Sequence, residues 1–284
     1  MTELSPRELA LRDYDENLEK YWERAFSELE AATPSENKMW LVGPSSYLFS
    51  IGGIKFAVDP QIRREKDFEA LSDRLCGYLS TLSFVLITHQ HGDHFCAPLI
   101  KKVKELPLVW YLPAKMPKRF IESAELDGNK CVFLNGGDCF SVGGLRITAF
   151  ESAHVRHGST AEMPELGYHF AYADKSIILP ADVRDYDFRV YPEFDDVDLC
   201  ISHLWAGDNA IDSEAYLPIL DKFVEFSLSL RAKRYFICHL YEIGREEKFM
   251  WHDMHAKLAI ERFSEKAPEV SFEIPRLSLP YELF

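Results

Sequence analysis

The sequence lacks an excess of basic residues, a long apolar run and a recognisable export signal. Its formal net charge is −14, whereas nonspecific binding to nucleic acid or anionic membranes needs a basic footprint. No apolar run approaches the roughly 18 residues of a membrane span, and the N-terminus has no basic stretch followed by an apolar one. We therefore expect no nucleic-acid partner, no membrane span and no secretion. A small anionic substrate stays compatible with this charge, because the local field of a cleft can oppose the net charge.

Cysteine pairs with the spacing of a zinc or redox motif are also missing. The six cysteines are scattered along the chain without a CxxC pair. Most of them lie inside apolar, strand-like runs, as small buried hydrophobic residues do. This distribution predicts a reduced, cytoplasmic protein.

Linkers and low-complexity segments are absent too, and the composition is that of an ordinary globular protein, with 47% hydrophobic and 27% charged residues. Ser5 and Glu8 have the spacing of a helix capping box, and apolar residues recur at three- and four-residue steps over residues 5–33. We expect residues 1–37 to form a helical extension and residues 38–284 to form one domain. The apolar stripe of the helix either packs on that domain or contacts a second copy in a homo-oligomer.

Strand-like runs and helical patterns intermingle through the rest of the chain. Gly52-Gly53 and Gly143-Gly144 each join two strand-like runs in a tight hairpin, which hints at an internal duplication, and Asp174-Lys175 predicts a third hairpin. Helical patterns lie near residues 64–76, 97–105, 115–126, 214–230 and 246–264, and the strand-like runs include FVLIT, LVWYL, CVFL, VDLCIS and YFIC. This order predicts an α/β (α+β) domain whose sheets are covered by helices.

The stretch FVLITHQHGDHF places a polar cluster directly after an apolar strand, where α/β sheets tend to place their sites. His89 and His91 are two positions apart and can face one ion. Gly92 lets the backbone turn, so that Asp93 and His94 face a second point. Neutral imidazole and carboxylate suit zinc and its first-row neighbours. A histidine-rich surface turn is the alternative, but chance rarely produces this pattern, so the sequence predicts a metal site.

The motif THQHGDH resembles the HxHxDH signature of the metallo-β-lactamase superfamily. That resemblance implies a four-layer αββα sandwich of two similar halves, and three further metal ligands at strand ends. The chain offers a histidine after LRITAF, an aspartate after SIILP and a histidine after YFIC. By resemblance, the first metal ion is held by His89, His91 and His154, the second by Asp93, His94 and His239, and Asp182 bridges the two.

The resemblance implies a hydrolase that uses two divalent ions, zinc or manganese, with iron also possible. Such a pair lowers the pKa of a bridging water and stabilises the charge that develops in the transition state. Asp93 is a candidate catalytic residue that orients the hydroxide or passes a proton to the leaving group. Asp59, in FAVDP, resembles an aspartate that orients the ligand loop. We expect a small ester, lactone or phosphodiester substrate. The alternatives are a nuclease or thioester hydrolase on the same metal pair, or a metal-binding relative without turnover.

Three details of the sequence indicate which branch of the superfamily the chain resembles. His91 stands where the flavin-linked di-iron enzymes have glutamate, and Asp182 stands where many β-lactamases have cysteine or no ligand. The segment WLVGPSSYLFSIGGIKFAVDP resembles the branch that contains L-ascorbate-6-phosphate lactonase and the N-acylphosphatidylethanolamine-hydrolysing phospholipase D. Members of that branch hydrolyse lactones or phosphodiesters.

A few residues near the ligands are candidates for substrate contact. His203, in ISHLWAGDN, is a second candidate catalytic residue that contacts substrate or donates a proton; alternatively it supports a ligand or caps its strand. Arg156, Arg184 and Arg245 each lie within a few residues of a ligand, so each is a candidate clamp for a phosphate or carboxylate. His252 and His255 are expected on a solvated helix face.

Overall fold

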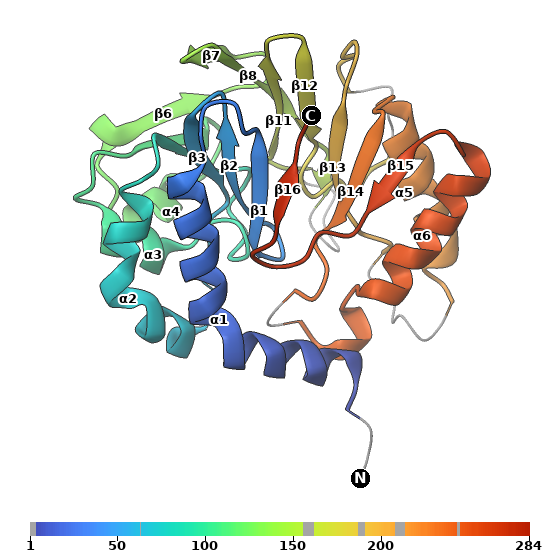
Figure 1. Cartoon of the computed structure of the whole chain (residues 1–284), viewed down its shortest axis with the longest axis horizontal. Coiled ribbons are helices and arrows are strands. Elements are labelled where there is room, and N and C mark those ends of the chain that lie inside the picture. The colour runs from blue at the N-terminus through green and yellow to red at the C-terminus, as the bar shows by residue number, and fades with distance from the viewer. Residues whose placement is uncertain (1–3, 63, 156–161, 187–190, 208–213, 243–244) are drawn as a thin grey trace.

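The computed structural model describes residues 4–62, 64–155, 162–186, 191–207, 214–242 and 245–284. Its architecture is a sandwich of two seven-stranded sheets with helices on both outer faces (Figure 1). A two-stranded ribbon, β9 (His154–Val155) with β10 (Glu162–Met163), lies outside the two sheets. The four-layer α/β sandwich and the N-terminal helix expected from the sequence are therefore confirmed.

The first sheet has the strand order β16-β1-β2-β3-β4-β5-β6. Strands β1, β2 and β3 are antiparallel neighbours, whereas β3, β4, β5 and β6 run parallel. The strands are β1 (Lys38–Gly43), β2 (Ser46–Ile51), β3 (Ile54–Val58), β4 (Phe84–Leu86), β5 (Val109–Pro113), β6 (Cys131–Leu134) and β16 (Pro280–Glu282).

The second sheet has the strand order β15-β14-β13-β12-β11-β8-β7 and repeats this design. Strands β7, β8, β11 and β12 are antiparallel neighbours, whereas β12, β13, β14 and β15 run parallel. The shared pattern agrees with the duplication suggested by the two Gly-Gly hairpins. The strands are β7 (Cys139–Val142), β8 (Leu145–Glu151), β11 (Leu166–Tyr172), β12 (Lys175–Leu179), β13 (Leu199–His203), β14 (Arg234–Cys238) and β15 (Ser271–Glu273).

Three apolar clusters hold the four layers together. The inner faces of the two sheets pack through aromatic side chains such as Phe49, Phe56 and Phe170, which are buried between them. The helices α1 to α4 cover the first sheet and α5 and α6 cover the second (Figure 1). The helices are α1 (Pro6–Ala31), α2 (Glu65–Leu79), α3 (Ala97–Val103), α4 (Lys118–Ser123), α5 (Leu217–Ser229) and α6 (Asp253–Lys266).

Helix α1 begins as the sequence predicts. Ser5 Oγ accepts from Glu8 N at 3.2 Å, and Glu8 Oε2 accepts from Ser5 N at 2.9 Å, which completes the capping box. The C-terminal half of the helix buries Trp22 and Phe26 against the domain. The division at residues 37 and 38 into an extension and a domain stays a prediction.

Several local expectations were wrong in detail. The third hairpin turns at Ala173-Asp174, because Lys175 already pairs with Tyr172 across the turn. The last helix begins at Asp253 rather than near residue 246, after a separate 3₁₀ turn. His252 caps this helix and His255 is fully buried, so neither lies on a solvated helix face.

In the described part of the chain, no helix has both the length and the apolar composition that crossing a membrane requires.

Candidate metal centre

The fold brings the candidate ligands together because several strands end at one edge of the sandwich. His89 follows β4, Asp182 follows β12, and His239 follows β14, all three of which are strands in parallel pairs. His154 lies just beyond β8. Parallel neighbours end at the same side of a sheet, so residues distant in sequence meet there.

The first group of ligands consists of His89, His91 and His154, whose ring nitrogens lie within 4.8 Å of one another. Nδ1 of His91 is 3.0 Å from Nε2 of His89 and 3.0 Å from Nε2 of His154. Two nitrogens bound to one tetrahedral zinc at about 2.0–2.1 Å would be about 3.3 Å apart. The three imidazoles therefore have nearly the spacing that a single ion requires.

Glu165 supports this first group, and sequence reasoning missed it. The carboxylate is fully buried, with Oε2 lying 3.1 Å from Nδ1 of His89 and accepting from the backbone N of Asp182 at 3.2 Å. A carboxylate on one ring nitrogen fixes the tautomer and turns the other nitrogen toward the metal. Glu165 thereby contacts both ligand groups.

The second group contains His94, Asp182 and His239. Oδ2 of Asp182 lies 3.3 Å from Nε2 of His94 and 3.5 Å from Nε2 of His239. Asp93 joins them, with Oδ2 3.5 Å from Nε2 of His239. The two groups are adjacent, since the rings of His89 and His94 have centroids 4.0 Å apart.

Asp59 orients the loop that carries the motif, as its resemblance implied. Its carboxylate accepts from Thr88 N at 2.8 Å and from Thr88 Oγ1 at 2.6 Å. Oδ2 also lies 2.7 Å from Nδ1 of His94. The bond to Nδ1 leaves Nε2 of His94 directed at Asp182, which is the arrangement expected of a metal-binding imidazole.

His203 stands behind Asp182 in a buried chain of hydrogen bonds. Its Nδ1 lies 2.7 Å from Oδ1 of Asp182, and its Nε2 lies 2.7 Å from the Tyr47 hydroxyl. Burial lowers the pKa of His203 to about 4, so the ring is neutral at pH 7. A carboxylate only accepts, so Nδ1 donates to Asp182 and Nε2 accepts from Tyr47. Both ring nitrogens are thus engaged inside the protein.

The loop between β1 and β2 fastens the ligand loops to one another. Ser45 Oγ donates to the carbonyl of Asp93 at 2.7 Å, and Ser46 Oγ donates to the carbonyl of Asp59 at 2.7 Å. His239 N donates to the carbonyl of Pro44 at 3.0 Å. Through these contacts, the GPSS segment at residues 43–46 holds the ligand loops in place.

Glu242 is a further carboxylate at the second group that the sequence did not reveal. One of its oxygens lies within 4.8 Å of the ligand atoms of Asp93 and His239. Burial and the nearby Asp93 raise the pKa of Glu242, and the Arg245 side chain donates to its Oε2. The second group therefore has one more carboxyl group beside it than its motif residues alone suggest.

The polar atoms of this centre fit a divalent cation. Among the residues that the structure describes, the buried Nε2 atoms of His94 and His239 make no hydrogen bond with good geometry, although carboxylates lie beside both. Burial lowers the pKa of His89 and lowers that of His154 to about 3. Neutral imidazoles, here those of His89 and His154, and ionised carboxylates are the donors that zinc, manganese and iron prefer.

The two groups differ in charge. Burial opposes the charged form of His94, but Asp182, Asp59 and Asp93 outweigh that effect and raise its pKa. Burial likewise opposes ionisation of Asp182, but His239 and His94 hold its pKa well below the usual range. The second group is consequently an ion-paired cluster, whereas the first consists of neutral imidazoles.

Local backbone conformation also marks the site. Asp59, Ala181 and His239 have φ values of 50°, 65° and 64°, in the left-handed region that residues other than glycine seldom adopt. Asp59 orients His94, Ala181 directly precedes Asp182, and His239 is itself a candidate ligand. Strained backbone of this kind persists where the surrounding contacts fix it.

The candidate arginines have different surroundings. Arg184 stacks over the Trp205 ring at 5.5 Å, and its charge contributes to the lowered pKa values of His91 and His154, so it lies nearest the first group. Arg245 is paired with Glu242. Arg156 lies outside the described residues.

Comparison with known proteins supports the superfamily. A family described as "Beta-lactamase superfamily domain" matches residues 39–204. No curated protein sequence matches the chain. Many solved structures match the chain. The three structures named next are at most 18% identical to it in sequence.

Three of these structures illustrate the likeness. CmlA, a diiron β-hydroxylase from Streptomyces venezuelae, has a TM-score of 0.62 at 16% identity; the match covers 88% of this chain but only 55% of CmlA. The metallo-β-lactamase fold protein YhfI from Bacillus subtilis has a TM-score of 0.61 at 18% identity, covering 87% of this chain and 100% of YhfI. The metallo hydrolase Igni18 from Ignicoccus hospitalis has a TM-score of 0.61 at 14% identity, covering 88% of this chain and 100% of Igni18.

These likenesses establish the fold, and the family match covers more than half of the chain. The chain belongs to the metallo-β-lactamase superfamily.

Proposed function

We propose that this protein is a dinuclear metal-dependent hydrolase that cleaves a small ester, lactone or phosphodiester. The observation that carries the proposal is the pair of adjacent ligand groups at one edge of the sandwich. All seven ligands that the motif resemblance implies are described, and all seven belong to these groups.

The proposed roles follow the geometry. His89, His91 and His154 would hold one ion; Asp93, His94 and His239 would hold the other, and Asp182 would contribute to both. Bound divalent ions would supply hydroxide at neutral pH and polarise the scissile bond. Asp93 lies beside His239 with an ionised carboxylate, because nearby histidines outweigh its burial and lower its pKa. A carboxylate with a lowered pKa is a weak base, so in this proposal Asp93 orients the attacking water.

His203 acts in this proposal through Asp182. Since the ring nitrogens of His203 bond Tyr47 and Asp182, the imidazole fixes the orientation of the bridging carboxylate instead of reaching the substrate. Arg184 is the candidate anion clamp, because its charge acts on the first ligand group.

Within the superfamily we propose the branch of lactone and phosphodiester hydrolases. The supporting feature is the GPSS loop that fastens the ligand loops, which is part of the sequence resemblance. A reducing compartment fits the six cysteines, none of which forms a disulfide bond in the structure.

A substrate panel tests this proposal. The purified protein, loaded with zinc or with manganese, is assayed on bis(p-nitrophenyl) phosphate and on a set of chromogenic lactones. We expect turnover of at least one class that chelation abolishes and re-addition of metal restores. Turnover that survives complete removal of metal would contradict the proposal. The proposal would also be contradicted if the metal-loaded protein were inactive on the whole panel and on p-nitrophenyl acetate.

A further inference from the structure

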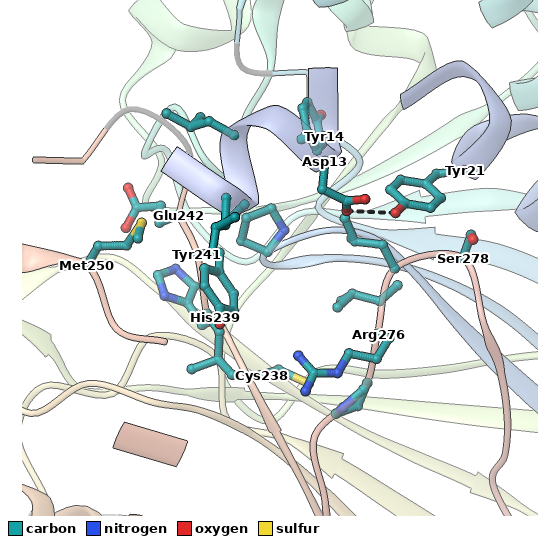
Figure 2. Close-up of a pocket in the computed structure, with 18 of the residues that line it drawn as sticks. Asp13, Tyr14, Tyr21, Cys238, His239, Tyr241, Glu242, Met250, Arg276 and Ser278 are labelled. Atoms are coloured by element: carbon teal, nitrogen blue, oxygen red, sulfur yellow. Dashed lines mark hydrogen bonds between the residues drawn. The ribbon is translucent and has the colours of Figure 1, made fainter. Parts of the chain in front are cut away.

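A large cavity lies between the N-terminal half of α1 and the segments that follow β1 and β14. Its volume is about 610 Å³, within the range of sites that bind small molecules. In Figure 2, Asp13, Tyr14 and Tyr21 come from α1 on one side, and His239, Tyr241 and Glu242 follow β14 on the other. The C-terminal segment closes a third side with Arg276 and Ser278.

The cavity adjoins the second ligand group. His239 and Glu242 line it, and both also belong to the cluster that contains Asp93. A molecule in the cavity would therefore have one end at the metal centre and the rest of its length under α1.

The walls favour an apolar occupant. Leucine and methionine side chains line much of the cavity, among them Leu9, Leu41, Met250 and Leu279. Leu9 is 45% exposed, so much of its apolar side chain is accessible to an occupant of the cavity.

The polar side chains of the wall are already engaged with the protein. Arg276 is paired with Asp253 at 2.6 Å, and Arg24 is paired with Glu28 at 2.9 Å. Arg7 Nε donates to the Arg245 carbonyl at 3.0 Å. The Tyr21 hydroxyl donates to Asp13 at 2.7 Å. An incoming ligand consequently meets few groups that need a polar partner.

Most of this wall lies outside the segment that the family match covers. The family match covers residues 39–204, whereas α1, the segment after β14 and the C-terminal segment all lie outside it. Of the residues in the lining, Leu41 and Pro44 fall inside the match.

We propose that this cavity binds the apolar acyl chain of an ester substrate, and that α1 is the element that selects for chain length. The inference rests on the proposed hydrolase function for its reaction, but the binding site stands on the cavity itself. The scissile ester would lie at His239 and Glu242, and the chain would extend along Leu9 and Met250.

A substitution that fills the cavity tests the proposal against a matched control. Ala10 lines the cavity from α1, whereas Ala31 is exposed at the far end of the same helix and does not line it. Ala10→Trp should therefore occupy the acyl site, and Ala31→Trp should leave it open. Thermal melting by circular dichroism establishes that both variants fold.

The first readout requires no turnover. The neutral apolar fluorophore N-phenylnaphthylamine is titrated into the zinc-loaded protein. We expect saturable binding to the unmodified chain and to Ala31→Trp, and at least about tenfold weaker binding to Ala10→Trp. Equal binding to all three proteins would overturn the proposal whether or not the protein is an esterase.

The second readout compares p-nitrophenyl acetate with p-nitrophenyl octanoate. Each methylene that becomes buried should raise kcat/KM by about fourfold, so the unmodified protein should prefer octanoate. Ala10→Trp should lose that preference, and Ala31→Trp should keep it. Metal-dependent turnover of both esters without a chain-length preference would overturn the acyl site and leave the hydrolase function standing. Fluorophore binding that follows the expected pattern without any metal-dependent turnover would instead contradict the hydrolase function.

Discussion

The two ligand groups lie side by side but are built differently. The first consists of His89, His91 and His154, which burial keeps neutral. The second places His94 and His239 among the carboxylates of Asp182 and Asp93, which raise the pKa values of both imidazoles. One group therefore offers neutral donors to an ion, and the other offers negative charge as well. The difference teaches that shared strand-end geometry does not make the two candidate ligand groups equivalent.

Removing one ligand from each group should have the largest effect. In His154→Ala the first group loses one of three imidazoles, and in His239→Ala the second loses a nitrogen that also contacts Asp93. We expect turnover to fall on the order of 10³-fold in each, because several kcal/mol of transition-state stabilisation depend on both ions. Steady-state kinetics on the best substrate of the panel measure it. Near-normal turnover in either variant would show that one ion suffices.

The carboxylates behind the ligands should have intermediate effects, and each should act on its own group. Glu165→Gln weakens the partner of His89, and Asp59→Asn weakens the partner of His94. Loss of such a partner typically costs about 10–100-fold in metal affinity. Titration with a chelator resolves the two ions by affinity. We expect Glu165→Gln to release the first ion more easily and Asp59→Asn the second; release of the same ion in both variants would argue against separate groups.

The Tyr47–His203 contact should have the smallest effect on catalysis. Tyr47→Phe removes the donor to Nε2 of His203, which is buried. We expect a loss of about 1–3 kcal/mol in the free energy of unfolding, because a buried acceptor is left without a partner. Turnover should fall less than in Asp59→Asn, since the Asp182 contact remains. Denaturant unfolding measures the first quantity, and a larger loss of turnover than in Asp59→Asn would place His203 in direct contact with the reaction.

Much of the architecture is readable from sequence because local signals and the fold agree. Apolar runs such as FVLIT and YFIC become buried strands, and the histidines that follow them fall at the sheet edge. Two glycines with positive φ form each of the hairpin turns at residues 52–53 and 143–144. The hairpin at Ala173 was misplaced by one residue because an alanine with φ of 53° gives no such signal.

The remainder of the site depends on tertiary packing. Glu165 directly precedes β11 and Tyr47 lies in β2, and neither has a neighbour in sequence that marks it as a partner of a ligand. Glu165 meets His89 because β11 passes close to the end of β4, and Tyr47 meets His203 because the two sheets face each other. The cavity under α1 likewise arises from three segments far apart in the chain.

The metal content of the purified protein tests the central claim most directly. Elemental analysis after zinc reconstitution and desalting should give about two ions per chain in the unmodified protein. His154→Ala and His239→Ala should each retain about one, because each leaves the other group intact. A content well under one ion per chain in the unmodified protein, or two ions retained in both variants, would contradict the assignment of these residues as two metal-binding groups.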